Sequence, residues 1–162
     1  MSQDFTPVVK APTGRGDPLK VVRAVPALAG APLVKALGDR LERICSLALV
    51  RRHAAGVVVF QPGDTGGSLL FVLSGALRVF ARDGEKVVEL ETAPPGAVVG
   101  EGEVLAGENK RQLSAVAQGP VEVLEIARDL LGVAGALPEP LRACLEATRA
   151  RRASLLEQRR GK

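Results

Sequence analysis

Five charged side chains fall within one short stretch, "GEGEVLAGENKR" at residues 100–111, and three of them could form a binding site. Glu101 and Glu103 each follow a glycine, and Arg111 closes the stretch ten residues after Glu101. An arginine can hold a phosphate through two parallel hydrogen bonds, and a carboxylate can accept a hydrogen bond from a sugar hydroxyl. The two glycines let the backbone approach a bound group closely. The stretch therefore suits either a cradle for an anion or a solvated turn between strands.

Little else in the chain could do chemistry. The single histidine, His53, excludes a multi-histidine metal site and histidine-based nucleophilic catalysis. Cys45 and Cys144 lie far apart and form no C-x-x-C motif, so we expect two reduced, mostly buried thiols. Without Trp or Tyr, the chain has no set of aromatic platforms for single-stranded nucleic acid. We expect a protein that is not an enzyme and holds no metal.

The net charge of +4 is unevenly distributed. Residues 26–140 carry three more acidic than basic side chains, whereas residues 141–162 carry five more basic than acidic ones. This basic end is typical of a solvated helix face, and a nucleic-acid contact is the alternative. No apolar run reaches the roughly 20 residues of a membrane span, and the N-terminus lacks the pattern of a secretion signal. We expect a cytoplasmic protein without membrane contact.

Apolar periodicity divides the chain into three parts. Residues 1–25 mix Pro, Gly and charges without a period, which predicts a flexible leader. Residues 26–140 begin with a helix that runs from Pro32 to Ala48 and continue with short strands separated by turn residues, including an Asp83-Gly84 hairpin. The strands are predicted at 57–60, 69–73, 76–81, 86–90, 112–117 and 121–126. Residues 141–162 form a basic helix, so the predicted class is a mainly β jelly roll with flanking helices.

The order of glycines within the β part resembles that of the cyclic-nucleotide-binding domain family. "GVVVFQPGDTGGSLLFVLSGALRVF" (56–80) has the family's glycines and Gly-Asp turn at matching spacings. "PPGAVVGE" resembles the Gly-Asp-x-Phe-Gly-Glu entry to its phosphate-binding cassette, with Ala97 and Val99 replacing Asp and Phe, and Arg111 matches the cassette's arginine. The resemblance covers residues 30–150 and implies a double-stranded β-helix. Catabolite activator protein, protein kinase A regulatory subunits and cyclic-nucleotide-gated channels have this sensor domain.

The resemblance implies a cyclic nucleotide, cAMP or cGMP, as the ligand. In this register Gly100-Glu101 is the family's Gly-Glu, and a short helix begins at Gly102; choosing Glu103 instead would shorten the spacing to Arg111 to eight residues. Arg111 would bind the phosphate and Glu101 a ribose hydroxyl. The implied ligand-binding residues are Gly100, Glu101, Gly102, Glu103, Arg111, Gln112, an apolar wall of Val72, Leu73 and Val99, and Leu141 and Leu145 of a C-terminal lid helix.

Three further residues depart from the family pattern, and the first of them, Gly102, weakens the short helix. Glu103 places a negative charge where the family usually has a small residue, and Gln112 replaces the usual Ser, Thr or Ala, which leaves cAMP against cGMP open. Two functions follow. One is a stand-alone sensor that signals through its C-terminal helix to a homodimer mate or another protein. The other is a degenerate roll that binds no nucleotide, serves as an interaction or assembly module, and has Glu101 and Arg111 paired with each other.

The C-terminal helix is the basis of two further predictions, on DNA binding and on truncation. In transcription regulators of this family a helix-turn-helix domain follows the long C-terminal helix, and none follows here, so sequence-specific DNA binding is not expected. The helix after Pro140 carries Leu141, Leu145 and Arg152 along one side. Removal of residues 141–162 is expected to weaken ligand binding and to leave the β-roll folded.

Overall fold

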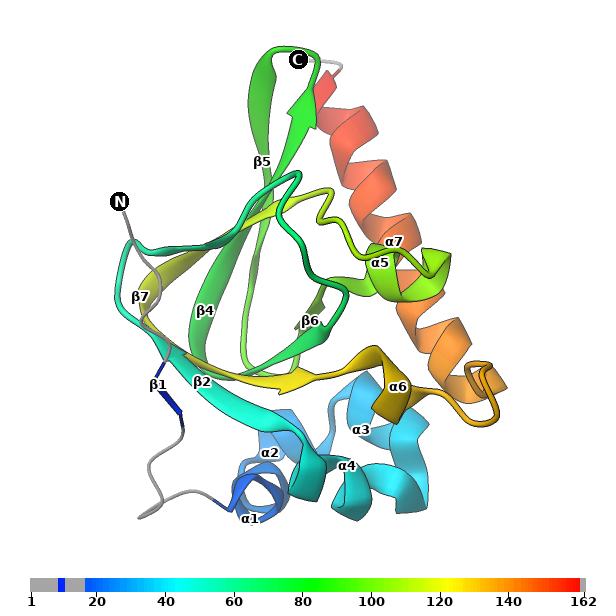
Figure 1. Cartoon of the computed structure of the whole chain (residues 1–162). Coiled ribbons are helices and arrows are strands. Elements are labelled where there is room, and N and C mark those ends of the chain that lie inside the picture. Colours follow the sequence, from blue (N-terminus) through cyan, green and yellow to red (C-terminus); the bar gives the residue numbers. More distant parts are fainter. Residues whose placement is uncertain (1–8, 11–16, 161–162) are drawn as a thin grey trace.

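The computed structural model describes residues 9–10 and 17–160, and its centre is one antiparallel sheet coiled into a roll (Figure 1). The strands run in the order β1-β2-β7-β4-β5, while β3 also pairs with β7 and β6 with β4. This arrangement confirms the mainly β jelly-roll class with flanking helices. The strands are β1 (Val9–Lys10), β2 (Leu49–His53), β3 (Val58–Phe60), β4 (Leu69–Asp83), β5 (Lys86–Ala93), β6 (Val98–Val99) and β7 (Ser114–Ile126).

Helices cover two sides of the roll. Figure 1 shows the N-terminal helices beneath it and α7 along one flank. Within residues 9–10 and 17–160, no helix is long and apolar enough to span a bilayer. The helices are α1 (Pro18–Ala24), α2 (Pro26–Ala29), α3 (Pro32–Leu37), the 3-10 helix η2 (Gly38–Arg40), α4 (Leu41–Leu47), α5 (Glu101–Ala106), α6 (Arg128–Leu131) and α7 (Glu139–Arg160).

Two of the strands are longer than the sequence predicts. The turn residues Ser74-Gly75 and Gly119-Pro120 suggest four short strands, yet β4 and β7 run through both points. Their pairing shifts register on either side of Ser74, so these residues form bulges and do not end the strands. At Gly75, φ is 77° and an added Cβ would lie 2.2 Å from the carbonyl oxygen of Pro120. A glycine is therefore required for the two strands to cross so closely.

The N-terminal region differs from the prediction in two ways. Residues 18–24, assigned to a flexible leader, form α1 instead, with Asp17 capping the backbone N–H of Leu19 and Val22 buried in the core. The rest of the predicted leader, apart from β1, lies outside the described residues. The single helix predicted from Pro32 is interrupted at Gly38, where φ is 57°, and becomes α3, η2 and α4.

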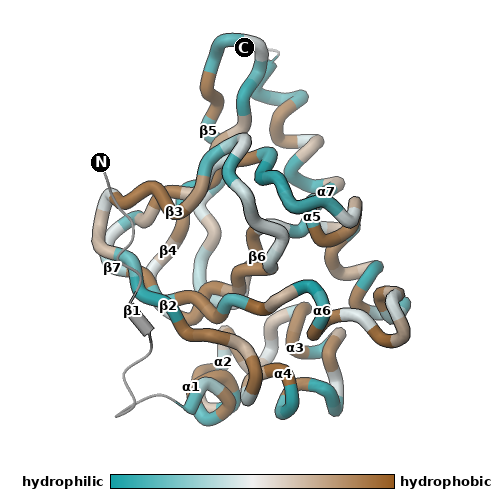
Figure 2. The backbone as a smooth tube through the Cα atoms, in the orientation of Figure 1, coloured by the Kyte–Doolittle hydropathy of each residue, from teal (hydrophilic) through white to brown (hydrophobic). Residues whose placement is uncertain are grey.

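The buried apolar side chains form two clusters, and α7 contacts both. The first lies beneath the roll, among the N-terminal helices, and includes the fully buried Leu141 and Leu145. The second fills the roll between β4, β5 and β7, and Leu155 and Leu156 pack against it. In Figure 2 much of β4 is hydrophobic, whereas α7 alternates between hydrophilic and hydrophobic positions. The first half of α7 is thus part of the main core, and its second half covers the roll.

Arginines fasten the second half of α7 to the β4–β5 hairpin. Arg151 and Arg152 both bind Glu91 of β5, and Arg160 pairs with Asp83 at the end of β4. Arg159 donates hydrogen bonds to the carbonyl oxygens of Glu89 and Leu90. Much of the basic C-terminal end, which the sequence offers as a surface for a partner, is therefore engaged within the chain.

Candidate functional site

The predicted cassette begins at a tight turn between β6 and α5. Gly100 has a φ of 97°, in the left-handed region that glycine tolerates, and α5 starts at Glu101, one residue earlier than predicted. A Cβ on Gly100 would lie 2.7 Å from Nη1 of Arg111 and 2.7 Å from the carbonyl oxygen of Ser68. The missing side chain thus lets the arginine lie directly against the backbone of the turn.

Arg111 is buried, and both of its terminal nitrogens are hydrogen-bonded to the protein. Its Nη1 donates to Oε1 of Glu103 at 3.0 Å and to the carbonyl oxygen of Ser68 at 2.9 Å. Its Nη2 donates to the Ser68 hydroxyl at 3.0 Å, and the guanidinium stacks on the Phe60 ring, 4.3 Å from its centroid. The degenerate-roll alternative pairs Glu101 with Arg111, and that pairing is wrong, because Arg111 pairs with Glu103.

Glu101 instead binds an arginine of α7. Its Oε1 accepts from Nη1 of Arg152 at 2.7 Å, and Nε of the same arginine donates to Glu91 at 2.6 Å. Burial raises the pKa of Glu101, although the charge of Arg152 acts in the opposite direction. Burial also pushes the pKa of Glu91 upward, but the hydrogen bonds and charges of Arg152 and Arg151 outweigh it and leave that pKa low. Arg152 therefore ties α7 to both α5 and β5.

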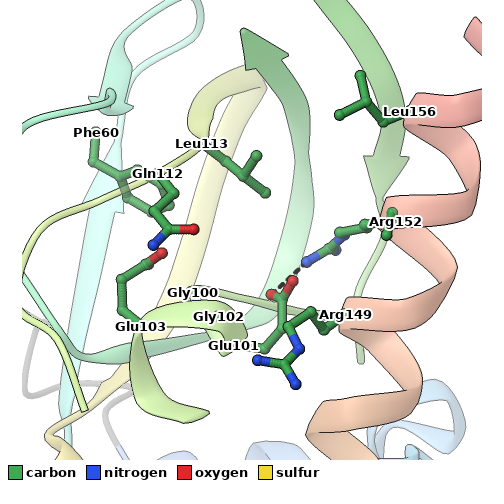
Figure 3. Close-up of a pocket in the computed structure, with 11 residues that line it drawn as sticks. Phe60, Gly100, Glu101, Gly102, Glu103, Gln112, Leu113, Arg149, Arg152 and Leu156 are labelled. Carbon is green, nitrogen blue, oxygen red and sulfur yellow. Dashed lines mark hydrogen bonds and ion pairs between the residues drawn. The ribbon is translucent and has the colours of Figure 1, made fainter. Parts of the chain in front are cut away.

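A small pocket lies between α5, the start of β7 and α7 (Figure 3). Its volume is about 140 Å³. Glu101 and Arg152 meet at one side of it, and Phe60, Glu103 and Gln112 lie at the other. The lining residues are Phe60, Gly100, Glu101, Gly102, Glu103, Gln112, Leu113, Arg149, Arg152, Ala153 and Leu156. The pocket thus has apolar walls with carboxylates and guanidiniums at its base and lid, a combination suited to a small polar ligand.

The structure brings only part of the predicted ligand set to this pocket. Five of the predicted residues line it, namely Gly100, Glu101, Gly102, Glu103 and Gln112, and Arg111 reaches it through Glu103. The predicted apolar wall lies elsewhere: Val72 and Val99 are in the core of the roll and Leu73 is in the lower core. Leu141 and Leu145 also belong to the lower core and do not line the pocket. The sequence predicts these two leucines as lid residues. Because they are fully buried, they instead hold the first half of α7 in the core.

The sequence does not assign the pocket residues supplied by α7. Arg149, Arg152, Ala153 and Leu156 cover the site, about one to three turns beyond the predicted lid. One signal was available, since Arg152 falls on the same side of the helix as Leu141 and Leu145, and an arginine on an apolar face needs a buried acid. In the described part of the chain, no group of three or more His, Cys, Asp or Glu side chains could hold a metal ion.

Replacing Glu101 with Gln should change how stability depends on pH. Because burial raises the pKa of Glu101 above its ordinary value of 4.5, the folded state holds this proton more tightly than the unfolded state does. The stabilisation is present at low pH and is lost as pH rises through the folded-state pKa. Urea unfolding from about pH 4 to about pH 8 should show the wild type losing stability relative to Glu101→Gln. Parallel pH profiles for the two proteins would contradict this expectation.

Comparisons with known proteins agree with the architecture. The family model described as "Cyclic nucleotide-binding domain" matches residues 50–132. A search of curated proteins gave no match. Among solved structures, Thermus thermophilus catabolite activator protein is 27% identical with a TM-score of 0.55, and the match covers 79% of this chain and 55% of that one.

Two further neighbours are kinase regulatory proteins. The regulatory domain of Toxoplasma gondii protein kinase A, solved with cAMP, is 14% identical with a TM-score of 0.61 over 87% of this chain and 51% of its own. The regulatory subunit of a cAMP-independent protein kinase A from Trypanosoma cruzi, bound to guanosine, is 18% identical with a TM-score of 0.59 over 81% of this chain and 42% of its own.

For these three neighbours the similarity is that of one domain to part of a larger chain. This chain spans about half the length of each of the three neighbours. The matched part makes up between 42% and 55% of the neighbour's own chain. The family model covers slightly more than half of the 162 residues, and it includes the α5 turn and Arg111. With the roll, the turn and the arginine in place, the chain belongs to the cyclic nucleotide-binding domain family.

Proposed function

We propose that this domain binds a ribose-containing ligand of the cyclic-nucleotide class, with cAMP and cGMP as first candidates, and that α7 reports whether the site is occupied. One observation carries the proposal: the Gly100-Glu101 turn and the Arg111 guanidinium meet beside a pocket that α7 closes. The role of Glu101 is to accept a hydrogen bond from a ribose hydroxyl, and Arg111 provides the positive charge of the cassette.

The attachment of α7 suits it to this output. Leu141 and Leu145 fix its first half in the core, whereas residues from Arg149 onward cover the pocket. A ligand that bonds to Glu101 competes with Arg152 for the same carboxylate, and so it loosens the contact between α5 and α7. A ligand shifts such an equilibrium by the difference in its affinity for the two positions of the helix. The helix then acts on a second copy of the chain or on another protein.

The ligands of the fold neighbours support a broad ligand class. One neighbour was solved with cAMP and another with guanosine, so rolls of this kind accommodate a purine ribonucleoside with or without a phosphate. We take both kinds of molecule as candidates for this chain.

A degenerate site is the second candidate, and the charge pairing favours it. Both Glu101 and Arg111 already have oppositely charged partners within the chain. The pocket volume of about 140 Å³ is also below the roughly 300–1,000 Å³ typical of ligand sites. Under this alternative, the network holds α7 permanently in place and the domain serves as a scaffold.

Thermal denaturation and calorimetry with cAMP, cGMP, adenosine and guanosine distinguish the two candidates. A ligand at about 100 times its Kd should raise Tm by roughly 5–10 °C for a domain of this size. Ala153→Phe, which fills the pocket from α7, should abolish the shift. Ala150→Phe adds the same ring at an exposed position of α7 that does not line the pocket, and it should leave the shift unchanged. No heat and no shift with any of the four ligands would favour the degenerate site.

A further inference from the structure

The arginine of the cassette is already paired with a carboxylate of the same chain. Nη1 of Arg111 is occupied by Glu103 and the Ser68 carbonyl oxygen, and Nη2 is occupied by the Ser68 hydroxyl. The side chains of both ion-pair partners are almost completely buried, at 5% and 4% exposed. Within this pair the carboxylate of Glu103 occupies the acceptor position that a phosphate would need. An anionic ligand must therefore displace a buried carboxylate before it can reach the arginine.

The position of Glu103 makes this displacement unfavourable. Glu103 lies in the first turn of α5 and lines the pocket together with Glu101, so a displaced carboxylate remains beside the ligand. A phosphodiester would then meet two negative side chains on the α5 side of the pocket, across from Arg149 and Arg152 of α7. Like charges in a poorly solvated site repel strongly because little water screens them.

The buried charges of the site are already balanced. Four charged residues are buried in the described chain, namely Glu101, Glu103, Arg111 and Arg152, which gives two carboxylates and two guanidiniums. An uncharged ligand keeps this balance among the four buried groups, whereas a cyclic nucleotide adds one negative charge to them. We propose, on the basis of the ligand-binding function above, that the site takes an uncharged purine nucleoside in preference to a cyclic nucleotide, and that Glu103 determines this preference.

The hydrogen-bonding groups of the pocket fit a nucleoside. Ribose hydroxyls are donors, and each carboxylate has lone pairs beyond the one that its arginine uses. On the α7 side, Nη2 of Arg152 is the buried side-chain nitrogen without a hydrogen-bond partner in the described residues, although the Arg152 side chain is only 3% exposed. A buried donor of this kind calls for an acceptor. A carbonyl or ring nitrogen of a purine base supplies one, while the sugar faces Glu101 and Glu103.

The test compares nucleosides and cyclic nucleotides on the full chain by calorimetry. Wild-type protein should bind adenosine or guanosine at least tenfold more tightly than the corresponding cyclic nucleotide. Glu103→Ala releases Arg111 from its internal anion and should reverse the order, with cyclic-nucleotide affinity rising at least tenfold and nucleoside affinity falling. Glu103→Gln keeps the shape of the side chain and its hydrogen bond to Arg111, and it should shift the preference in the same direction if Glu103→Ala fails to fold.

Glu108→Ala is the matched control, because it removes an exposed carboxylate from the same segment, one that accepts from Gln112 at 3.1 Å. It should change the ratio of the two affinities less than twofold. Wild-type protein that binds cyclic nucleotide as tightly as nucleoside overturns the inference and leaves the ligand-binding function intact. A nucleoside preference that survives both Glu103 substitutions also overturns it. Failure of wild-type protein to bind any of these ligands overturns the ligand-binding function itself, and the inference with it.

Discussion

Replacing Arg111 with Met should lower the free energy of unfolding by about 3–5 kcal/mol, because it leaves a buried carboxylate without its cation. Glu103 would lose its ion-pair partner, and the carbonyl oxygen of Ser68 would lose a donor. The stacking of the guanidinium on Phe60 would be lost as well. Urea unfolding followed by circular dichroism at neutral pH measures the change.

Two further variants establish the cause. Arg111→Met combined with Glu103→Leu removes both charges and should recover most of the lost stability, since an apolar pair often replaces a buried ion pair without cost. Arg78→Met is the exposed counterpart, because Arg78 also pairs with a glutamate, Glu89, and lies over a ring, Phe80, at 5.1 Å. It should change stability little. Equal losses at Arg78 and Arg111 would show that burial of the ion pair is not the decisive factor.

Replacing Leu145 with Ala should lower the free energy of unfolding by about 2–5 kcal/mol, as expected when a fully buried leucine is truncated. Leu145 lies on α7 but is fully buried in the cluster beneath the roll, together with Leu141. Leu47, which is 49% exposed at the end of α4, is the control, and its replacement by Ala should cost less than about 0.5 kcal/mol. Thermal and urea unfolding measure both.

The same burial changes the design of a truncated protein. The sequence suggests that the roll folds without residues 141–162, but that deletion would remove two fully buried leucines from the core. A chain that ends after Pro138 should therefore lose its cooperative unfolding transition. A chain that ends after Thr148 keeps both leucines, removes the part of α7 that covers the pocket, and should still unfold cooperatively. Cooperative unfolding of the shorter chain would show that α7 is dispensable to the core.

The cassette could be predicted from the sequence because its parts are local. Three residues define it within a dozen positions: the glycine of the turn, the glutamate after it and the arginine ten residues later. The turn needs a positive φ, which few residues other than glycine adopt, so the glycine can be recognised in the sequence. The jelly roll follows from short apolar runs and turn residues, although Gly75 marks a bulge within β4 and not an end. A turn glycine and a bulge glycine have the same sequence pattern.

The ion pairs could not be predicted, because they depend on where α7 packs. Glu101 and Glu103 are chemically identical candidates for Arg111, and local spacing does not choose between them. Arg152, about 50 positions away in the sequence, forms an ion pair with Glu101. Glu103 is therefore the carboxylate that pairs with Arg111. The identity of the lid residues depends on the same packing, since the hydrophobic side of α7 faces the lower core at Leu141 and the pocket only from Arg149 onward.

The bonds from Arg159 to the carbonyl oxygens of Glu89 and Leu90 have a further consequence for the colloidal behaviour of the protein. β5 is the last strand in the sheet order and, among the strands that the structure describes, pairs with β4 alone, so its outer side is an open template to which another strand can add. In this structure the guanidinium of Arg159 caps part of that template. Any condition that lifts the end of α7, whether a ligand, acid or a truncation, also uncovers the template, and the protein then becomes more prone to associate edge to edge as its concentration rises.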